Sequence, residues 1–415
     1  MNDPFFFGAA TSSHQVEGNN HNNWSKWERE NAKRLTAAAQ KKTWDDHIRA
    51  GYPNPLQEEN YISGRAADHY NRFREDFDIA KSLGHNAHRF SIEWSRVEPE
   101  EGVFDEKELE HYRAVIRELR NRDIEPFVTI WHWTLPLWLS RKGGVMDRRF
   151  PAYFRRFTET LVRAFGNDVR FWITINEPEI VMANSYYKGQ WPPQKRNAWL
   201  TFRGLHTLMR AHRSAYDAIK AATPEAQVGP VMDMVHFEAD EGLINHLLKR
   251  LADRMWNSYF FLGVMDTADF IGLNFYFHNR ISRWYGRNRN ERISDMGWEL
   301  YPESLYHLLL ELKLLFGKPI YITENGLADN RDKHREYFIA EHLSAMKKAI
   351  EKGVDVRGYF HWSLLDNFEW DSGFWPRFGL VEIDYKTMER RIRPSALKYK
   401  QHIEAWLANP PRPEQ

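Results

Sequence analysis

Eight short runs of β-branched and aromatic residues recur along the chain, and each ends near a polar or turn-forming residue. Runs of this kind are typical of strands that are buried on both faces. The pattern therefore predicts eight strands, at 5–10, 87–92, 126–131, 171–175, 228–232, 270–275, 320–323 and 356–362.

Segments with the periodicity of amphipathic helices alternate with these runs. In the clearest of them, Leu205, Leu208, Met209 and His212 follow the i, i+3, i+4, i+7 spacing of one helix face. Another begins after Pro302, and the first turn of a helix accepts proline because its backbone nitrogen needs no partner there. Helices are predicted at 68–83, 106–119, 153–165, 200–221, 243–261, 303–316, 335–351 and 395–407.

The repeated order of strand and helix indicates an α/β fold with a parallel sheet. We expect a single (β/α)8 TIM barrel over residues 1–408, followed by a disordered, proline-rich tail at 409–415. An open doubly wound sheet is disfavoured because no glycine-rich phosphate loop follows the first strand. Two long βα segments, 11–67 and 277–301, should form loops around an active-site crater at the carboxyl ends of the strands.

Charge and composition narrow the classes of partner. Lys and Arg number 58 and Asp and Glu 57, so a net charge of about +1 gives no reason to expect nucleic acid or an anionic membrane. Arginines and aromatics interleave over 278–292, as in some single-strand binders, but we interpret this stretch as a solvated loop. Neither a basic leader nor a long apolar run is recognisable, which favours a cytoplasmic protein without a membrane partner. A homo-oligomer remains open.

The residue types present exclude several kinds of catalytic and metal site. The chain has no cysteine, which excludes disulfides, thiol nucleophiles and Cys-bound metals. No His-Glu-x-x-His motif or acidic cluster predicts another metal site, so none is expected. The chain has 17 tryptophans. A large core accounts for most of the aromatic residues, but flat indole rings also suit the C–H face of a sugar.

Two glutamates stand at the ends of two similar runs. Glu177 follows Asn176 after the fourth run, and Glu324 follows Thr323 after the seventh. A carboxylate just past a buried strand loses hydration, which costs free energy. Because the ends of barrel strands converge, we expect the two carboxyls to act together, one as a proton donor and the other as a nucleophile.

Five sequence blocks surround these residues in barrel order: FGAATSSHQ at 7–15, RFSIEWSR at 89–96, NEP at 176–178, TENG at 323–326 and WSLLDNFEW at 362–370. Together they resemble the signatures of glycoside hydrolase family 1, the retaining β-glucosidases and β-galactosidases. The NEP block alone is weak evidence, but five blocks in order are specific, and the resemblance extends from about residue 5 to 406. It implies a TIM barrel that needs no cofactor and hydrolyses small β-glycosides through a covalent glycosyl-enzyme.

The resemblance also implies catalytic roles. Glu177 matches the acid/base and Glu324 the nucleophile, and a retaining mechanism places two such carboxyls about 5–5.5 Å apart. Arg89 and Tyr276 match the partners of the nucleophile, and Asn176 matches the residue that binds the 2-hydroxyl.

Further positions match the family's sugar-binding residues. Gln15 and Glu369 would each form hydrogen bonds to two sugar hydroxyls. The Trp362 ring would lie beneath the sugar ring, and Trp298 would stack on the aglycone. Taken alone, His132 is more typical of a core histidine, but its position after the third strand favours contact with the substrate. The expected substrate-binding set is Gln15, His132, Trp133, Asn274, Trp298, Trp362, Glu369, Trp370 and Phe378. Glu369 suits both an equatorial and an axial 4-hydroxyl, which leaves glucose, galactose, fucose and mannose open.

Departures from relatives refine this expectation. Enzymes for 6-phosphorylated sugars carry serine, lysine and tyrosine where this chain has Glu369, Pro376 and Phe378, so unphosphorylated sugars are favoured. Thioglycosidases lack the acid/base carboxylate that Glu177 supplies here, and the segment 19–61 departs from the commonest bacterial pattern. Two alternatives remain: a non-catalytic sugar-binding barrel, which would lack a carboxylate, and an endo-acting barrel glycosidase, which would need an open groove.

Overall fold

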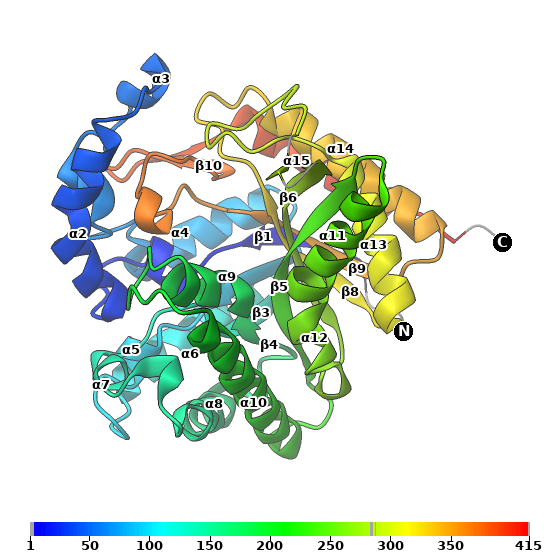
Figure 1. Ribbon diagram of the computed structural model, residues 1–415. Helices are drawn as coiled ribbons and strands as arrows, with labels where there is room; N and C mark the ends of the chain where they lie inside the picture. The colour runs from blue at the N-terminus through cyan, green and yellow to red at the C-terminus, as the bar shows by residue number, and fades with distance from the viewer. Residues whose placement is uncertain (1–3, 283–284, 287, 414–415) are drawn as a thin grey trace.

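A computed structural model describes residues 4–282, 285–286 and 288–413 and shows a closed barrel of parallel strands wrapped by helices (Figure 1). The barrel strands are β1 Phe6–Ala10, β2 Ala87–Ser91, β3 Glu125–Trp131, β4 Phe171–Asn176, β5 Gln227–Ala239, β6 Ile271–Ser282, β8 Ile320–Gly326 and β9 Val356–Trp362. Each pairs in parallel with its neighbours, and the pairings of β5 with β6 and of β1 with β9 complete the ring. The predicted (β/α)8 barrel is confirmed.

Helices connect consecutive strands and cover the outside of the barrel. The main ones are α4 His69–Ser82, α6 Glu106–Arg120, α8 Phe150–Phe165, α10 Ala198–Ala222, α13 Glu303–Phe316, α14 Arg335–Glu351 and α15 Pro394–Ala408. The helix predicted over 243–261 is wrong as a single α-helix. It divides into α11 Leu243–Ala252, the π-helical η4 Asp253–Ser258 and α12 Tyr259–Leu262.

The long βα segments hold more regular structure than the loops that were predicted. The first contains α1 Ser13–Val16, α2 Asn23–Ala39, α3 Asp46–Arg49 and η1 Glu58–Tyr61. The helix α2 starts at a capping box, in which the Asn22 side chain accepts from the Ser25 amide and the Ser25 hydroxyl accepts from the Asn22 amide.

The second long segment begins as strand and is irregular from residue 288 onward. It continues β6 to Ser282 and adds the short antiparallel β7, Tyr285–Gly286. Arg280 is therefore on a strand and donates to Glu238, not on a solvated loop as predicted. Arg283, Trp284 and Arg287 from the same predicted loop lie outside the described residues.

Short elements complete the fold. They are α5 Trp94–Val97, α7 Leu137–Arg141, η2 Gly144–Met146, α9 Pro178–Met182, η3 Ala183–Tyr187, η5 Met265–Thr267, η6 Trp370–Ser372, β10 Val381–Ile383 and β11 Arg390–Ile392. Residues 409–413 lie in neither helix nor strand, and 414–415 are outside the described chain, so the disordered tail stays a prediction. Nowhere in the described chain is there a helix with the length and apolar character required to cross a bilayer.

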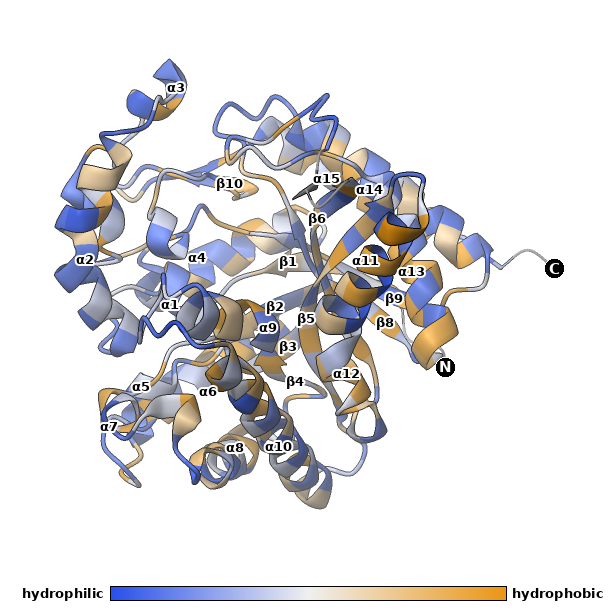
Figure 2. Cartoon of the chain, viewed as in Figure 1, coloured by the Kyte–Doolittle hydropathy of each residue, from blue (hydrophilic) through white to orange (hydrophobic). Residues whose placement is uncertain are grey.

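Two apolar layers hold the barrel together. One lies between strands and helices, and the hydrophobic strands at the centre of Figure 2 contribute to it. The other fills the barrel itself with aromatic rings, where Phe127 and Phe171 stack at 4.2 Å between centroids and Phe6 meets the edge of Phe127 at 5.4 Å. The barrel interior is thus a packed core below its polar upper end.

Both signature glutamates stand beside irregularities in the strand pairing. The register of β4 on β5 shifts between Ile173 and Asn176, and the register of β6 on β8 shifts between Leu273 and Asn274. Such bulges break the strict in–out alternation and redirect side chains. They occur where the barrel interior changes from apolar rings to polar groups.

Candidate active site

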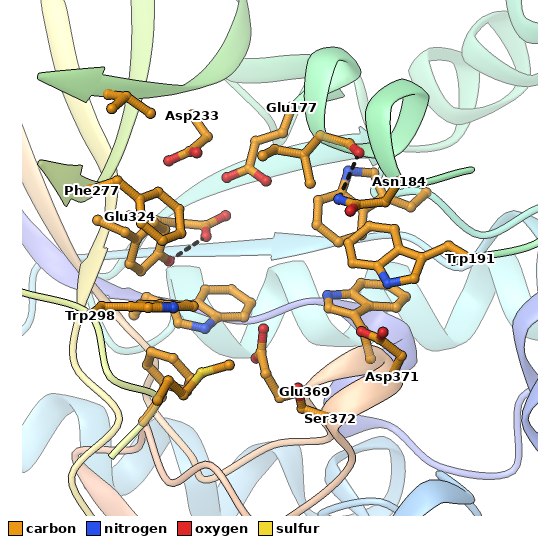
Figure 3. Close-up of a pocket in the computed structure, with 18 of the residues that line it drawn as sticks. Glu177, Asn184, Trp191, Asp233, Phe277, Trp298, Glu324, Glu369, Asp371 and Ser372 are labelled. Carbon is orange, nitrogen blue, oxygen red and sulfur yellow. Dashed lines mark hydrogen bonds between the residues drawn. The ribbon is translucent and has the colours of Figure 1, made fainter. Parts of the chain in front are cut away.

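A cavity of about 460 Å³ opens at the carboxyl ends of the barrel strands (Figure 3). That volume lies in the range of about 300–1,000 Å³ that is usual for small-molecule sites. The predicted site residues that line it are Gln15, His132, Trp133, Glu177, Tyr276, Trp298, Glu324, Trp362, Glu369, Trp370 and Phe378. The other three, Arg89, Asn176 and Asn274, are buried and hydrogen-bonded to one another and to the two glutamates. Every predicted site residue is therefore in one place.

The Glu324 carboxyl, on β8, is held by donors on both oxygens. Arg89 Nη1 is 2.5 Å from Oε1, and the Tyr276 hydroxyl donates to Oε2 at 2.7 Å. Burial leaves the pKa of Glu324 raised overall, but the Arg89 charge and the Tyr276 hydrogen bond limit the rise and favour the carboxylate. Glu324 is therefore the group of the pair that is built to be ionised.

The Glu177 carboxyl has a different environment, although it points into the same cavity (Figure 3). Asn274 Nδ2 donates to Oε1 at 2.6 Å, and no cation of the described chain contacts this carboxyl. Burial, followed by the negative charges of Glu324, Asp233 and Glu179, holds the pKa of Glu177 well above its usual value. Glu177 is therefore built to keep its proton.

A polar network connects the two glutamates beneath the cavity. Arg89 Nη2 donates to Asn176 Oδ1 at 2.5 Å, and Asn176 Nδ2 lies 3.2 Å from His132 Nε2. Burial and the nearby Arg89 charge hold the pKa of His132 well below its usual value, so its imidazole is neutral. His132 thus lines the cavity and contacts Asn176, which separates it from an ordinary core histidine. The network fixes Asn176 as an amide that can contact a bound molecule.

The deep end of the cavity combines polar groups with flat rings. Gln15 Nε2 donates to Glu369 Oε2 at 3.2 Å, and burial together with the Glu324 charge raises the pKa of Glu369 to about 8. His132 stacks between Trp362 and Trp370, with centroids 6.0 and 5.9 Å away. This alternation of hydrogen-bonding groups and indole faces suits a ring that carries several hydroxyls.

Backbone strain is concentrated at this site. Trp133, Glu177 and Trp370 have φ angles of +79°, +41° and +49°. Side chains larger than glycine adopt this left-handed region rarely, and residues held there cluster at functional sites. The surrounding fold holds three cavity residues in conformations that their own preferences disfavour.

The outer half of the cavity has an apolar wall. The Trp298 ring lies 4.7 Å from Phe277, 5.9 Å from Tyr276 and 5.9 Å from Phe378, measured between centroids. The described lining also includes Lys188, which is exposed. The wall therefore offers a platform for a flat or apolar group that extends from the deep end.

The sequence reasoning missed several lining residues, of which Asp233 is the most unusual. Its carboxyl is fully buried and, within the described chain, neither oxygen has a hydrogen-bond partner. Burial, followed by the charges of Glu179 and Glu324, holds its pKa well above the usual value. Asp233 directly follows the fifth predicted strand, so the rule that polar residues end barrel strands could have identified it. Other lining residues that were missed are Asn184, Trp191, Trp256 and Asp371.

Comparison with known proteins gives a consistent result. The sequence model described as "Glycosyl hydrolase family 1" matches residues 1–265 and 237–406. Beta-glucosidase A of Thermotoga maritima is 33% identical over 446 aligned residues, which cover 95% of this chain and 96% of that protein. A beta-galactosidase of Sulfolobus acidocaldarius is 31% identical over 80% of this chain and 82% of its own length.

Solved structures agree. A beta-glucosidase from Thermotoga maritima in complex with castanospermine superposes with a TM-score of 0.85 at 29% identity. The alignment covers 97% of this chain and 98% of that one. The complex of the Thermotoga maritima beta-glucosidase with glucoimidazole gives a TM-score of 0.84 at 30% identity.

Proposed function

Because this chain belongs to glycosyl hydrolase family 1, we propose that it releases unphosphorylated sugars from the non-reducing ends of small β-O-glycosides, with net retention. One observation carries this proposal: two buried carboxyls share a cavity and have opposite electrostatic partners. Glu324 is held by Arg89 and Tyr276, whereas Glu177 faces other carboxyls. A pair of this kind can supply a nucleophile and a proton at the same pH.

In the first step, Glu324 attacks the anomeric carbon while Glu177 gives its proton to the departing glycosidic oxygen. The C–O bond to the aglycone breaks, and an ester between the sugar and Glu324 forms. Asn176, positioned by Arg89, would bind the 2-hydroxyl, where a hydrogen bond strengthens as positive charge develops on the ring.

In the second step, water replaces the aglycone. Esterification removes the negative charge of Glu324, so the pKa of Glu177 falls and its carboxylate can take a proton from the water. The water oxygen forms a bond to the anomeric carbon and the ester breaks, which restores the ionised Glu324. Arg89 and Tyr276 again hold the released carboxylate.

The shape and charge of the deep end support the exo-acting and unphosphorylated parts of the proposal. Glu369 and Trp370 line the deep end, where an endo-acting enzyme would need a groove that continues. A 6-phosphate near Glu369 would meet a carboxyl group and the apolar Phe378, which offers no donor. A non-catalytic sugar-binding role is disfavoured because both carboxyls and all their partners are present.

The first test is hydrolysis of p-nitrophenyl β-glucoside and the matching galactoside, fucoside and mannoside by the purified chain. Glu324→Gly should lower kcat/KM by about 10⁴-fold or more, because the covalent step loses its nucleophile. Azide should restore part of the rate by attacking the anomeric carbon from the vacated space.

Glu225→Gly is a matched control, since Glu225 lies in an exposed turn, and it should keep full activity. Full activity of Glu324→Gly would refute the assignment of the nucleophile. Hydrolysis of the 6-phosphorylated glucoside in preference to the free one would refute the substrate class.

A further inference from the structure

The strands β5 and β6 continue beyond the rim of the cavity as a paired ribbon. Their register pairs Val235 with Phe277 and His236 with His278. Because side chains alternate between the two faces of a strand, consecutive residues face opposite sides. One face of the ribbon lines the cavity through Val235, Phe237, Phe277 and Asn279. The other face therefore carries His236, Glu238 and His278, away from the cavity.

These three side chains converge on one point. One ligand atom from each of His236, Glu238 and His278 lies within 4.8 Å of the other two. His278 Nε2 is 3.5 Å from Glu238 Oε2, which is close for an ion pair but outside hydrogen-bond geometry. A small ion could sit between them with contacts of about 2.0–2.2 Å to nitrogen and oxygen.

His278 is oriented as a histidine ligand would be. Its Nδ1 lies 2.6 Å from Glu299 Oε2, which positions this nitrogen to donate to the carboxylate and leaves Nε2 as the candidate ligand atom that faces Glu238. The side chain is 3% exposed, and Nε2 has no hydrogen-bond partner within the described chain. A buried nitrogen without a partner is costly, and a carboxylate behind the other ring nitrogen is typical of metal-bound histidine.

His236 is set in a similar way. Its Nδ1 lies 2.8 Å from the Ser304 hydroxyl on α13, and its ring stacks on His307 at 5.2 Å between centroids. Burial, and then the neighbouring His278 and His307, lower the pKa of His236 to about 4, so the imidazole is neutral at physiological pH. Burial would raise the pKa of Glu238, but Arg280 and His278 lower it overall and keep it anionic.

We propose that His236, Glu238 and His278 bind one divalent metal ion of the Zn²⁺ class on the outer face of the β5–β6 ribbon. Two imidazole nitrogens and one carboxylate oxygen form a ligand set that zinc and its neighbours prefer, with a fourth position left for water. The ion would fix together two strands whose opposite faces form the cavity wall. This assignment is independent of the proposed hydrolysis.

Arg280 competes with the ion for the same carboxylate. Its Nη2 donates to Glu238 Oε2 at 2.6 Å, and the Tyr301 hydroxyl lies 3.3 Å from Oε1. A bound metal must therefore share or displace the guanidinium. This competition predicts the direction of one effect: removal of the Arg280 charge should strengthen metal binding.

The test uses the full chain after treatment with a chelator, titrated with ZnCl2 in a calorimeter and with CoCl2 in a visible spectrometer. One equivalent of Zn²⁺ should bind and raise Tm by about 3 °C, and Co²⁺ should give the d–d bands of a four-coordinate site. His236→Ala and His278→Gln should each abolish this stoichiometric binding. Arg280→Gln should raise the affinity about tenfold.

His246→Ala is the matched control because His246 is an exposed histidine on α11, and it should bind as the wild type does. Circular dichroism of each variant separates loss of the site from loss of the fold, and His236 is only partly buried, so its variant should fold. The proposal is overturned if the wild type takes up no stoichiometric Zn²⁺, or if the double variant His236→Ala/His278→Gln binds it equally well.

Discussion

The two ends of the barrel interior are built from the same strands and have opposite chemistry. At the lower end of β3, β4 and β8, Phe127, Phe171 and Tyr321 pack ring against ring with almost no exposure. At the upper end of β4 and β8, the same strands end at Glu177 and Glu324, two buried carboxyls in a polar network. Within a few residues of one strand, the side chains thus change from apolar rings that stabilise the fold to carboxyl groups that can react.

The comparison shows which end of the barrel interior stabilises the fold and which end destabilises it. Apolar burial at the lower end stabilises the fold at about 25 cal/mol per Å². Buried carboxyls at the upper end oppose folding unless they are ionised and paired or keep their protons. Substitutions at the two ends should therefore have different effects. Those at the upper end should remove activity without loss of stability, and those at the lower end should reduce stability without loss of activity.

Of the changes that test this comparison, the largest effect is expected at Glu177. Glu177→Gln should lower kcat/KM for an alkyl β-glucoside by about 10²–10⁴-fold, because an amide cannot donate the proton that the leaving oxygen needs. The loss should be much smaller for p-nitrophenyl β-glucoside, whose leaving group departs without protonation. Thermal unfolding should show no loss of stability, with the exposed Glu159→Gln as control. Equal losses for both substrates would contradict the acid role.

Next in size is a change at the lower end. Phe127→Ala should lower the free energy of unfolding by about 3–5 kcal/mol, because it leaves a cavity among packed rings. The folded variant should keep nearly normal kcat. Chemical denaturation gives the first quantity and steady-state kinetics the second. The matched control is Phe202→Ala on α10, where the ring is 38% exposed and the effect should stay near 0.5 kcal/mol. A drop in kcat without a drop in stability would break the comparison.

The smallest expected effect tests how the carboxyl groups at the upper end act on one another. Asp233→Asn removes a carboxyl that, when ionised, raises the pKa of Glu177, so that pKa should fall. Activity requires protonated Glu177 and is lost as pH rises through its pKa, so the alkaline limb of kcat/KM should move to lower pH. A full pH profile with an alkyl β-glucoside, whose leaving oxygen needs the proton, measures this shift. An unchanged or higher alkaline limb would show that Asp233 does not act on Glu177.

The sequence predicted the barrel well because its strands are buried on both faces. Such strands are continuous apolar runs, and most of the helices between them carry one-sided patterns, as α13 and α14 show by starting and ending where predicted. The helix α2 was missed because its apolar face is interrupted by polar residues, and its capping box alone gives little signal. The extension of β5 was missed because it is half-exposed and lacks the apolar run of a barrel strand.

The candidate site was predictable for a related reason. Polar residues that directly follow apolar runs are visible in sequence, and convergence of strand ends then places them together. Asp233 obeys the same rule. The cluster of His236, Glu238 and His278 does not, because its members lie on two strands 42 positions apart and are joined by register and not by spacing. Sequence reasoning therefore expected no metal site.

The layer of aromatic rings below the cavity limits the paths by which substrate and products can enter and leave. Phe127, Phe171 and Tyr321 fill the barrel under the carboxyls of Glu177 and Glu324, so a sugar seated at the deep end has no way through. Aglycone and sugar must then leave by the outer half, one after the other. Any alcohol that enters after the aglycone has gone stands in the path of the incoming water and competes with it for the esterified sugar.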